Sequence, residues 1–452
     1  MAAQRYRGIS EAVTAMKNGE LSSGELVRHC LEKHQQYNEV LNATLCLAQD
    51  ASEQAAQCDA EAKQGRFRGR LHGIPLIVKD NINVKGLPTT VASALFAQSS
   101  PCERDARVIA KLREEGAIIL AKANMDEFAA HVSGRTSHWG PSINPWRPEE
   151  RFSPGGSSSG AAVAVAAGFA WGGIGTDTGG SVRLPAAWCG LCGLRPTYGS
   201  VSLDGVYPRA SSLDTVGALA RSVRDVALLM EIATEARNAP RAGDTSGNGP
   251  RIGILSEIME DVSPATRFVY SRSMERWSGL GVCARISFPL LEDPEAAATV
   301  DLLRSYEFAR DVRRDMEAHP DAENVVHAGV LADYRKGKSV TDEAYAQALR
   351  RKQEFTEAVE ALFAREGIDA LLLPVARFTA PRLSAQAEEF ALARNLVNLF
   401  SITEGPSLAL PGVQANGMPF GLQLVGPRGA DSRLLRAGMA YETAYEPFPM
   451  PL

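Results

Sequence analysis

Apolar residues recur every three or four positions along much of the chain, which is the pattern of helices with one buried face. Two such helices are predicted within residues 8–36, where Ser22 and Glu25 match the start of a capped helix. Residues 48–64 are rich in alanine and predict a third helix. Further helices are predicted at residues 106–115, 161–170, 217–235, 265–280, 296–318, 341–366 and 431–445.

Short, unbroken apolar runs mark the strands that we expect. They lie at residues 71–79, 117–122, 170–175, 251–255 and 370–374. Because the helix at 106–115 stands between the first two runs, this region predicts a βαβ unit in a partly parallel sheet. Residues 406–425 form two apolar segments joined by residues 414–417, which predicts a hairpin. The predicted fold class is therefore α/β.

The composition narrows the class of protein. The chain has 45% hydrophobic and 22% charged residues, as an ordinary globular protein does, and its net charge of −5 gives no indication of a basic face for nucleic acid. Residues 1–20 lack the apolar core of a signal peptide, and no apolar run has transmembrane length, so we expect a cytoplasmic protein without a membrane span. Residues 236–250 are polar and rich in proline and glycine, which predicts a surface loop or linker.

The cysteines and histidines offer little sign of a redox or metal site. The seven cysteines are an odd number without the spacing of a disulfide framework, which indicates reduced thiols. Cys189 and Cys192 form a single C-x-x-C in small, apolar surroundings, and we interpret them as buried packing thiols. His131 and His138 have no further clustered ligand, so no metal is expected.

Two clusters of glycines and hydroxyl residues interrupt the apolar pattern. They are GGSSSG at residues 155–160 and GTDTGGS at residues 175–181, and a small, apolar stretch separates them. Glycine has no Cβ, so it permits positive φ and lets the backbone approach a ligand closely. A serine beside such glycines can sit on a tight turn with several N–H groups aimed at one point. Acyl transfer requires this combination of a hydroxyl nucleophile and an oxyanion hole.

Together with the segment G-x-P-x-x-x-K-D-N at residues 73–81, the two clusters resemble the signature of the amidase signature family. Three matching segments in the right order are a specific signal, and the similarity extends from about residue 70 to 235. The resemblance implies that Ser181 is the nucleophile and that Ser157, 24 positions earlier on a cis peptide bond, bridges it to Lys79.

The resemblance also implies the fold and the division of the chain. We expect a single amidase domain over residues 1–452, built on one large mixed β-sheet with helices on both faces. Its parts would be N-terminal helices at 1–68, a motif-bearing core at 69–235 and a substrate-side part at 251–452 that returns to the sheet.

A serine hydroxyl is a weak nucleophile until a base takes its proton, and none of the seven histidines lies in the two clusters. A lysine can act instead when burial lowers its pKa, and Lys79 directly follows an apolar run. The oxyanion hole is expected from the backbone N–H groups of Thr178, Gly179, Gly180 and Ser181.

Other residues near the motifs are expected to play supporting roles. Asp177 is expected to order the turn, Arg183 to form a structural ion pair, and Ser158, by family analogy, to form a hydrogen bond within the relay. His131, Val132 and Ser133 align with the family segment that lines the acyl pocket, although an ordinary surface loop is an equal alternative.

One alternative site overlaps the first cluster. Residues 156–160 also match G-x-S-x-G, the nucleophile elbow of α/β-hydrolases, which would make Ser158 the nucleophile with Asp301 or Asp311 and His327 as partners. Such an elbow must follow a hydrophobic strand, whereas polar residues and prolines precede this one. The sequence therefore favours the lysine relay.

The substrate is less well determined. One branch of the family, the A subunit of aminoacyl-tRNA amidotransferase, binds the charged α-groups of glutamine with an arginine in an R-R-I-x-x-G-T-like segment and an aspartate before the final hairpin. Neither feature is found here, and the position that should hold the aspartate falls near Arg394. We therefore expect a stand-alone amidase that acts on a small carboxamide, with no metal or organic cofactor. A glutaminase-type A subunit and a biuret- or allophanate-type hydrolase remain alternatives. No direct nucleic-acid contact is expected, and a homodimer is left open.

Overall fold

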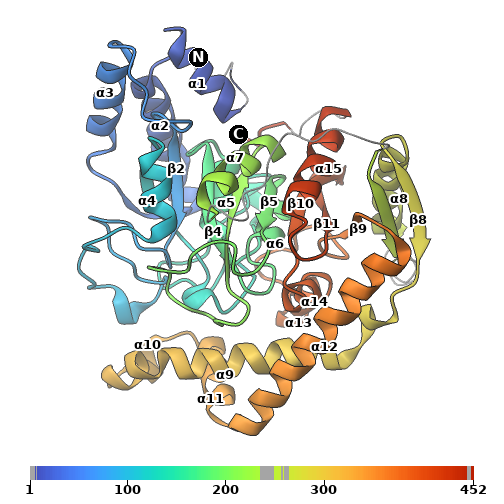
Figure 1. Cartoon of the computed structure of the whole chain (residues 1–452). Helices are drawn as coiled ribbons and strands as arrows, with labels where there is room; N and C mark the ends of the chain where they lie inside the picture. Colours follow the sequence, from blue (N-terminus) through green and yellow to red (C-terminus); the bar gives the residue numbers. More distant parts are fainter. Residues whose placement is uncertain (1–5, 7, 235–248, 256–257, 259–263, 445–448) are drawn as a thin grey trace.

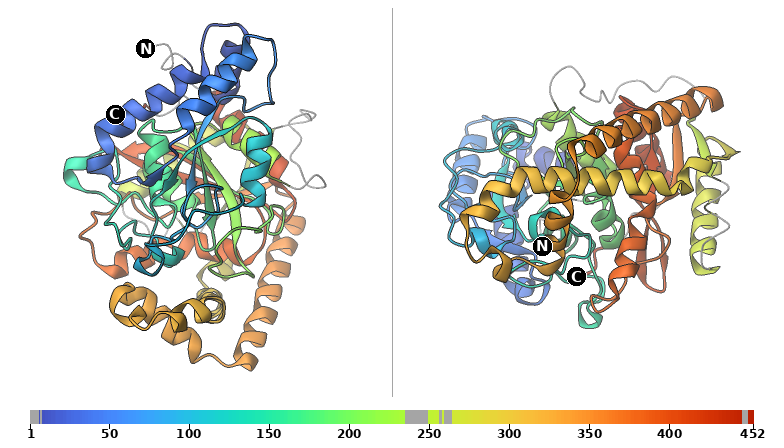
Figure 2. Two further views of the ribbon diagram at one scale, coloured as in Figure 1. Left: turned by 90° about the vertical axis from the view of Figure 1, so that its left-hand side faces the viewer. Right: turned by 90° about the horizontal axis from the view of Figure 1, so that it is seen from below.

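The computed structural model describes residues 6, 8–234, 249–255, 258, 264–444 and 449–452 (Figures 1 and 2). An 11-stranded mixed sheet runs through them. In spatial order its strands are β1 (Thr44–Leu47), β3 (Ile118–Ala123), β2 (Pro75–Lys79), β4 (Gly172–Asp177), β6 (Thr215–Ala220), β5 (Cys192–Arg195), β10 (Ser407–Ala415), β11 (Met418–Val425), β9 (Ala370–Pro374), β7 (Arg251–Leu255) and β8 (Val282–Ile286).

Helices cover both faces of this sheet, so the predicted α/β class and mixed sheet are confirmed (Figure 1). The longer helices are α1 (Ile9–Lys17), α2 (Ser23–Leu41), α3 (Ala51–Ala62), α4 (Arg107–Glu114), α5 (Ser159–Ala166), α6 (Arg183–Cys189), α7 (Val223–Ala233), α8 (Pro264–Ser278), α9 (Pro294–Ala318), α11 (Ala328–Lys338), α12 (Asp342–Glu366), α13 (Ala387–Ala393), α14 (Asn395–Ile402) and α15 (Asp431–Ala444). Helix α9 crosses the molecule below the sheet and packs against α11, α12 and α14 (Figure 2).

The predicted βαβ unit positions the site. Strand β2 is parallel to β3 on one side and to β4 on the other, and Val78 of β2 pairs with Ile174 of β4. The carboxyl ends of parallel strands meet at one edge of a sheet. Lys79, the last residue of β2, and Asp177, the last residue of β4, therefore lie at the same edge.

Several local predictions are confirmed in detail. Ser22 and Glu25 form the reciprocal hydrogen bonds of a capping box at the start of α2. The hairpin β10–β11 turns at Asn416 and Gly417, which both have positive φ, as a tight two-residue turn requires.

Other predictions were wrong or incomplete. The helix predicted at 217–235 begins only at Val223, because residues 215–220 form β6, a central strand between β4 and β5. Strands β1, β5 and β8 and helices α11, α13 and α14 were not anticipated. They are short or lack a clear period, and tertiary pairing and packing stabilise them. Most of the predicted linker, residues 236–248, lies outside the described residues.

The structure agrees with the prediction that Cys189 and Cys192 are buried packing thiols, since both are buried and all seven cysteines are free. Burial raises the pKa of the Cys189 thiol well above its usual range. In the part of the chain that the structure describes, no helix has the length and apolar content needed to cross a bilayer.

Candidate active site

The two glycine-serine clusters meet at the edge of the sheet where β2 and β4 end. The first cluster leads into α5, and the second occupies the turn between β4 and α6. Each contains a glycine in the left-handed region, Gly155 at φ +77° and Gly180 at φ +100°. The peptide bond between Gly156 and Ser157 is cis, as the family resemblance implied.

Lys79 is fully buried and reaches both neighbouring segments. Its Nζ lies 2.7 Å from Ser157 Oγ, 2.8 Å from Thr176 Oγ1 and 3.3 Å from the carbonyl oxygen of Thr176. Within the described residues it forms no ion pair with a carboxylate. The lysine therefore has hydrogen-bond partners but no neutralising charge in direct contact.

A second buried lysine shows the contrast. Lys122, near the end of the adjacent strand β3, is also fully buried, but its Nζ lies 3.1 Å from the Asp80 carboxylate. For Lys79, burial lowers the pKa from 10.5 to about 7, and the more distant carboxylates of Asp177, Asp126 and Asp214 only partly oppose this. A large fraction of Lys79 is therefore neutral near pH 7.

A neutral amine fits these contacts. It has two N–H groups to donate and one lone pair that accepts a hydrogen bond. The carbonyl of Thr176 can only accept, whereas the hydroxyl of Ser157 can rotate and donate to the lone pair. The arrangement can thus remove a proton from Ser157.

The connection from Ser157 to Ser181 is close along the backbone but is not closed by a side-chain hydrogen bond. The N–H of Ser158 donates to the carbonyl of Ser181 at 3.1 Å, which ties the two clusters together. Among the described residues, Ser181 Oγ forms no hydrogen bond and instead lines a pocket. Catalytic hydrogen bonds often tighten only when a substrate is bound.

The expected oxyanion donors are only partly available. The N–H of Gly180, one of the four predicted donors, donates to Asp177 Oδ1 at 2.8 Å and is therefore not free to bind an oxyanion. The N–H groups of Thr178, Gly179 and Ser181 have no acceptor in the described part of the chain. These three remain as candidates to stabilise an oxyanion.

Asp177 makes the contacts of a turn-ordering carboxylate. It accepts hydrogen bonds from the N–H groups of Gly180 and Val182, and it pairs with Arg183, whose Nε and Nη2 both lie 3.0 Å from its oxygens. Burial alone would raise the pKa of Asp177, but Arg183 and then Arg195 hold it well below its usual range. Asp177 is thus ionised, and its oxygens already accept hydrogen bonds from the turn and from Arg183. The ion pair predicted for Arg183 is confirmed.

Thr176 is a site residue that was not predicted from the sequence. Its carbonyl accepts from Lys79 and also from Ser158 Oγ, each at 3.3 Å, and its hydroxyl accepts from Asn81 Nδ2 at 3.1 Å. Ser158 thus contacts the same carbonyl as the lysine. The only indication in the sequence is that Thr176 lies within the second cluster.

The alternative hydrolase triad is not assembled. Ser158 Oγ donates to a carbonyl and not to a histidine. His327 packs its ring against His131, and its Nδ1 accepts from the N–H of Gly329. Asp301 and Asp311 each pair with an arginine instead.

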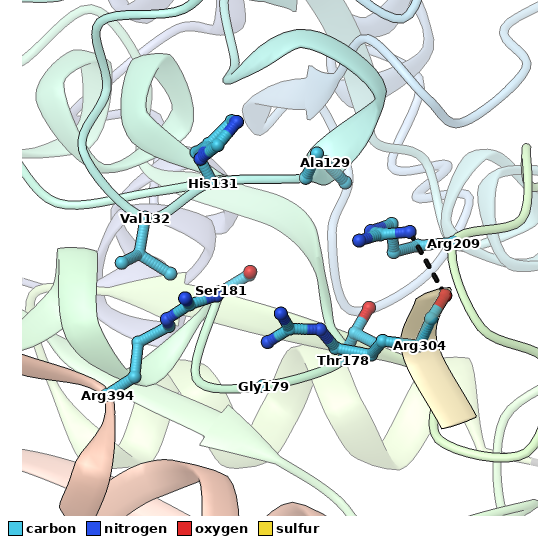
Figure 3. Close-up of a pocket in the computed structure, with 10 residues that line it drawn as sticks. Ala129, His131, Val132, Thr178, Gly179, Ser181, Arg209, Arg304 and Arg394 are labelled. Atoms are coloured by element: carbon cyan, nitrogen blue, oxygen red, sulfur yellow. Dashed lines mark hydrogen bonds between the residues drawn. The ribbon is translucent and has the colours of Figure 1, made fainter. Parts of the chain in front are cut away.

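A small, partly open pocket lies beside Ser181, and its empty volume of about 220 Å³ includes space open to solvent (Figure 3). Its lining residues are Ala129, Ala130, His131, Val132, Thr178, Gly179, Ser181, Arg209, Arg304 and Arg394. Of the three residues predicted to contact the substrate, His131 and Val132 line this pocket. Ser133 does not line the pocket, because its hydroxyl donates to Asp126 Oδ1 at 3.3 Å.

The three pocket arginines were not predicted as site residues. Arg304 lies on α9, where a charged residue at helical spacing usually faces solvent, and Arg209 lies in a loop with no motif. Arg394 was noted only for its position in the chain. Burial lowers the pKa of His131 well below its usual range, so the imidazole in this pocket is neutral at pH 7.

Comparison with known proteins shows which family the chain belongs to. The family model described as Amidase matches residues 25–435. The A subunit of glutamyl-tRNA(Gln) amidotransferase from Thermus thermophilus is 36% identical over 94% of both chains, and the protein of that name from an Exiguobacterium species is 32% identical over 98% of both. A solved structure described as an amidase has a TM-score of 0.87 at 33% identity, covering 96% of this chain and 99% of that one. The peptide amidase of Stenotrophomonas maltophilia has a TM-score of 0.86 at 29% identity, covering 98% of both. The chain therefore belongs to the amidase family of enzymes.

Proposed function

We propose that the protein hydrolyses the C–N bond of a small carboxamide to a carboxylate and ammonia through an acyl-enzyme on Ser181. The observation that supports this most directly is the 2.7 Å contact between the buried Nζ of Lys79 and Ser157 Oγ. A lysine kept partly neutral at this point has few structural uses, and it lies beside the pocket that contains Ser181.

The proposed reaction uses the chain's own groups at each step. Neutral Lys79 takes the proton of Ser157 while Ser157 takes that of Ser181, and Ser181 Oγ forms a bond to the amide carbon. The N–H groups of Thr178 and Gly179, with that of Ser181, hold the negative oxygen. The relay then returns its proton to the leaving nitrogen, the C–N bond breaks and ammonia departs. Water attacks the ester by the same route and releases the carboxylate.

A glutaminase that serves an amidotransferase complex is the second candidate. It is favoured by relatives of 32–36% identity that are named as A subunits of glutamyl-tRNA(Gln) amidotransferase. The pocket argues against it, because glutamine carries an ammonium group and the described pocket lining holds arginines but no carboxylate. We therefore place the stand-alone amidase first.

A panel of primary amides distinguishes these functions. Glutamine, asparagine, indoleacetamide, biuret and simple aliphatic amides would each be assayed for released ammonia. We expect activity on at least one amide other than glutamine, and its loss in Ser181→Ala. Turnover of glutamine alone would favour the glutaminase function.

Covalent labelling tests the nucleophile independently of substrate. A fluorophosphonate probe should label the wild type and the Ser100→Ala variant, which alters an exposed serine, but not Ser181→Ala. Equal labelling of Ser181→Ala would contradict the assignment.

We also propose that residues 1–452 act as one amidase domain, since strands from Thr44 to Val425 join the same sheet. One cooperative unfolding transition is expected in urea. Two well-separated transitions would contradict a single domain.

A further inference from the structure

The pocket beside Ser181 holds more positive charge than its neighbouring carboxylates neutralise. Arg209 pairs with Asp333, and Arg304 Nη2 lies 3.1 Å from Asp301. Within the described residues, the side chain of Arg394 forms neither a hydrogen bond nor an ion pair. Three guanidinium groups thus line one pocket, and one of them is unpaired.

Arg394 is placed to act on a ligand. It lies at the junction of α13 and α14, and Figure 3 shows its side chain extending toward Ser181. Its Nε is buried without an acceptor. Burial lowers its pKa to about 9, and the nearby Arg304 guanidinium adds to the effect, so the group is charged at pH 7. A charge of this kind is costly unless an anion accompanies it.

The other titratable groups around the pocket do not supply that anion. Asp126 is occupied by the N–H groups of Gly134, Arg135 and Thr136. Asp301, which pairs with Arg304, is also shared with Lys336. His131 is neutral at pH 7, so it adds no negative charge. The local balance therefore remains positive.

We propose that Arg394 binds the carboxylate of the substrate, so that the amide cleaved at Ser181 is the monoamide of a short dicarboxylic acid. A guanidinium matches a carboxylate with two parallel N–H···O bonds, and the second donor of this subsite is the neighbouring Arg304. Ser181 and Arg394 line the same small pocket, so only a short chain can separate the amide from the carboxylate. This inference rests on the proposed amidase function.

The same charges disfavour amino acid amides. Asparagine is succinamate with an added ammonium group, and glutamine is related to glutaramate in the same way. In this pocket the ammonium would lie among guanidiniums with no carboxylate in the described lining. The monoamides without the amino group should therefore be the better substrates.

The test compares three amides of similar shape: succinamate, asparagine, and levulinamide, in which a methyl ketone replaces the carboxylate. We expect kcat/KM for succinamate, or for glutaramate in the longer series, to exceed that for the neutral amide by on the order of ten- to a hundredfold. In Arg394→Gln this ratio should fall toward one, since only Arg304, which already pairs with Asp301, remains to bind the carboxylate, and Arg394→Lys should restore part of it. Arg365→Gln, which alters an exposed arginine, should keep the wild-type ratio.

Either of two kinetic results would overturn the proposal. One is equal kcat/KM for the anionic and neutral amides in the wild type. The other is a uniform loss in Arg394→Gln that leaves their ratio unchanged, which would indicate a structural role only.

Calorimetry with Ser181→Ala separates this subsite from the proposed reaction. Binding of succinamate that is lost on adding Arg394→Gln would support the subsite even if the wild type hydrolysed no amide. Hydrolysis without preference for a carboxylate would support the reaction and reject the subsite. The absence of both binding and hydrolysis of monoamides would reject the inference.

Discussion

Lys79 and Lys122 are buried lysines on adjacent parallel strands, and only Lys122 has a carboxylate in contact. This difference makes a sharp test of the proposed base. Replacing Lys79 by methionine keeps an unbranched side chain of similar length but removes the amine. The variant should lose activity. It should also remove the pH-dependent free-energy cost of burying a charged amine at this position.

The magnitude follows from the pKa of Lys79, lowered from 10.5 to about 7. A change of this size corresponds to about 5 kcal/mol. Between these two pH values the unfolded chain keeps the proton that the folded protein has released, so the unfolded state binds more protons. The free energy of unfolding must then rise with pH across this window. From pH 6.5 to 9.5 the contribution of Lys79 amounts to about 3 kcal/mol.

The assay is urea denaturation of the wild type and Lys79→Met at pH 6.5 and pH 9.5. The methionine variant leaves the hydroxyls of Ser157 and Thr176 without the amine, which costs about 1–3 kcal/mol for each unpaired group at either pH. The quantity to compare is therefore the change in the free energy of unfolding between the two pH values. The wild type should gain about 3 kcal/mol relative to the variant on going to pH 9.5, because all other titrating groups are shared.

Lys122→Met is the matched control. It should destabilise the protein by about 3–5 kcal/mol, because it leaves the Asp80 carboxylate buried without its partner. Lys79→Met should also reduce kcat by about 10²–10⁴ through loss of the base. Parallel stability–pH curves for the wild type and Lys79→Met, or near-normal turnover of that variant, would refute the reasoning.

Three further predictions concern the same site. The logarithm of kcat/KM should rise with pH up to about 7 and then level off, because the amine of Lys79 must be neutral; a flat profile from pH 6 to 8.5 would argue against it as the base. Gly180→Ala should lower both Tm and kcat, since φ is +100° and the added Cβ would lie 2.4 Å from a valine methyl of α14; wild-type behaviour would show that the turn can relax. Asp177→Asn should destabilise the protein by about 3–5 kcal/mol, as it leaves two buried guanidinium groups without their carboxylate, and a Tm close to that of the wild type would contradict this.

The sequence predicted most reliably what local chemistry controls. The apolar run before Lys79 forms a buried strand, as expected, and the hairpin turns at Asn416 and Gly417, where positive φ is needed. The two clusters could be recognised because glycines at fixed offsets from a serine determine which turns the backbone can adopt. These features depend on neighbours along the chain, so the sequence carries them directly.

Only the tertiary structure revealed how distant segments share one pocket. Arg304 and Arg394 line one pocket with Ser181 because residues of α9 and α14 lie against Gly179 and Gly180 in the turn after β4. A charged residue on a helix has the same local pattern whether it faces solvent or a ligand. The missing counter-ion of Lys79 and the occupied N–H of Gly180 depend equally on what surrounds each group. Local sequence determines which groups the chain can present, whereas burial and packing decide their charge state and their partners.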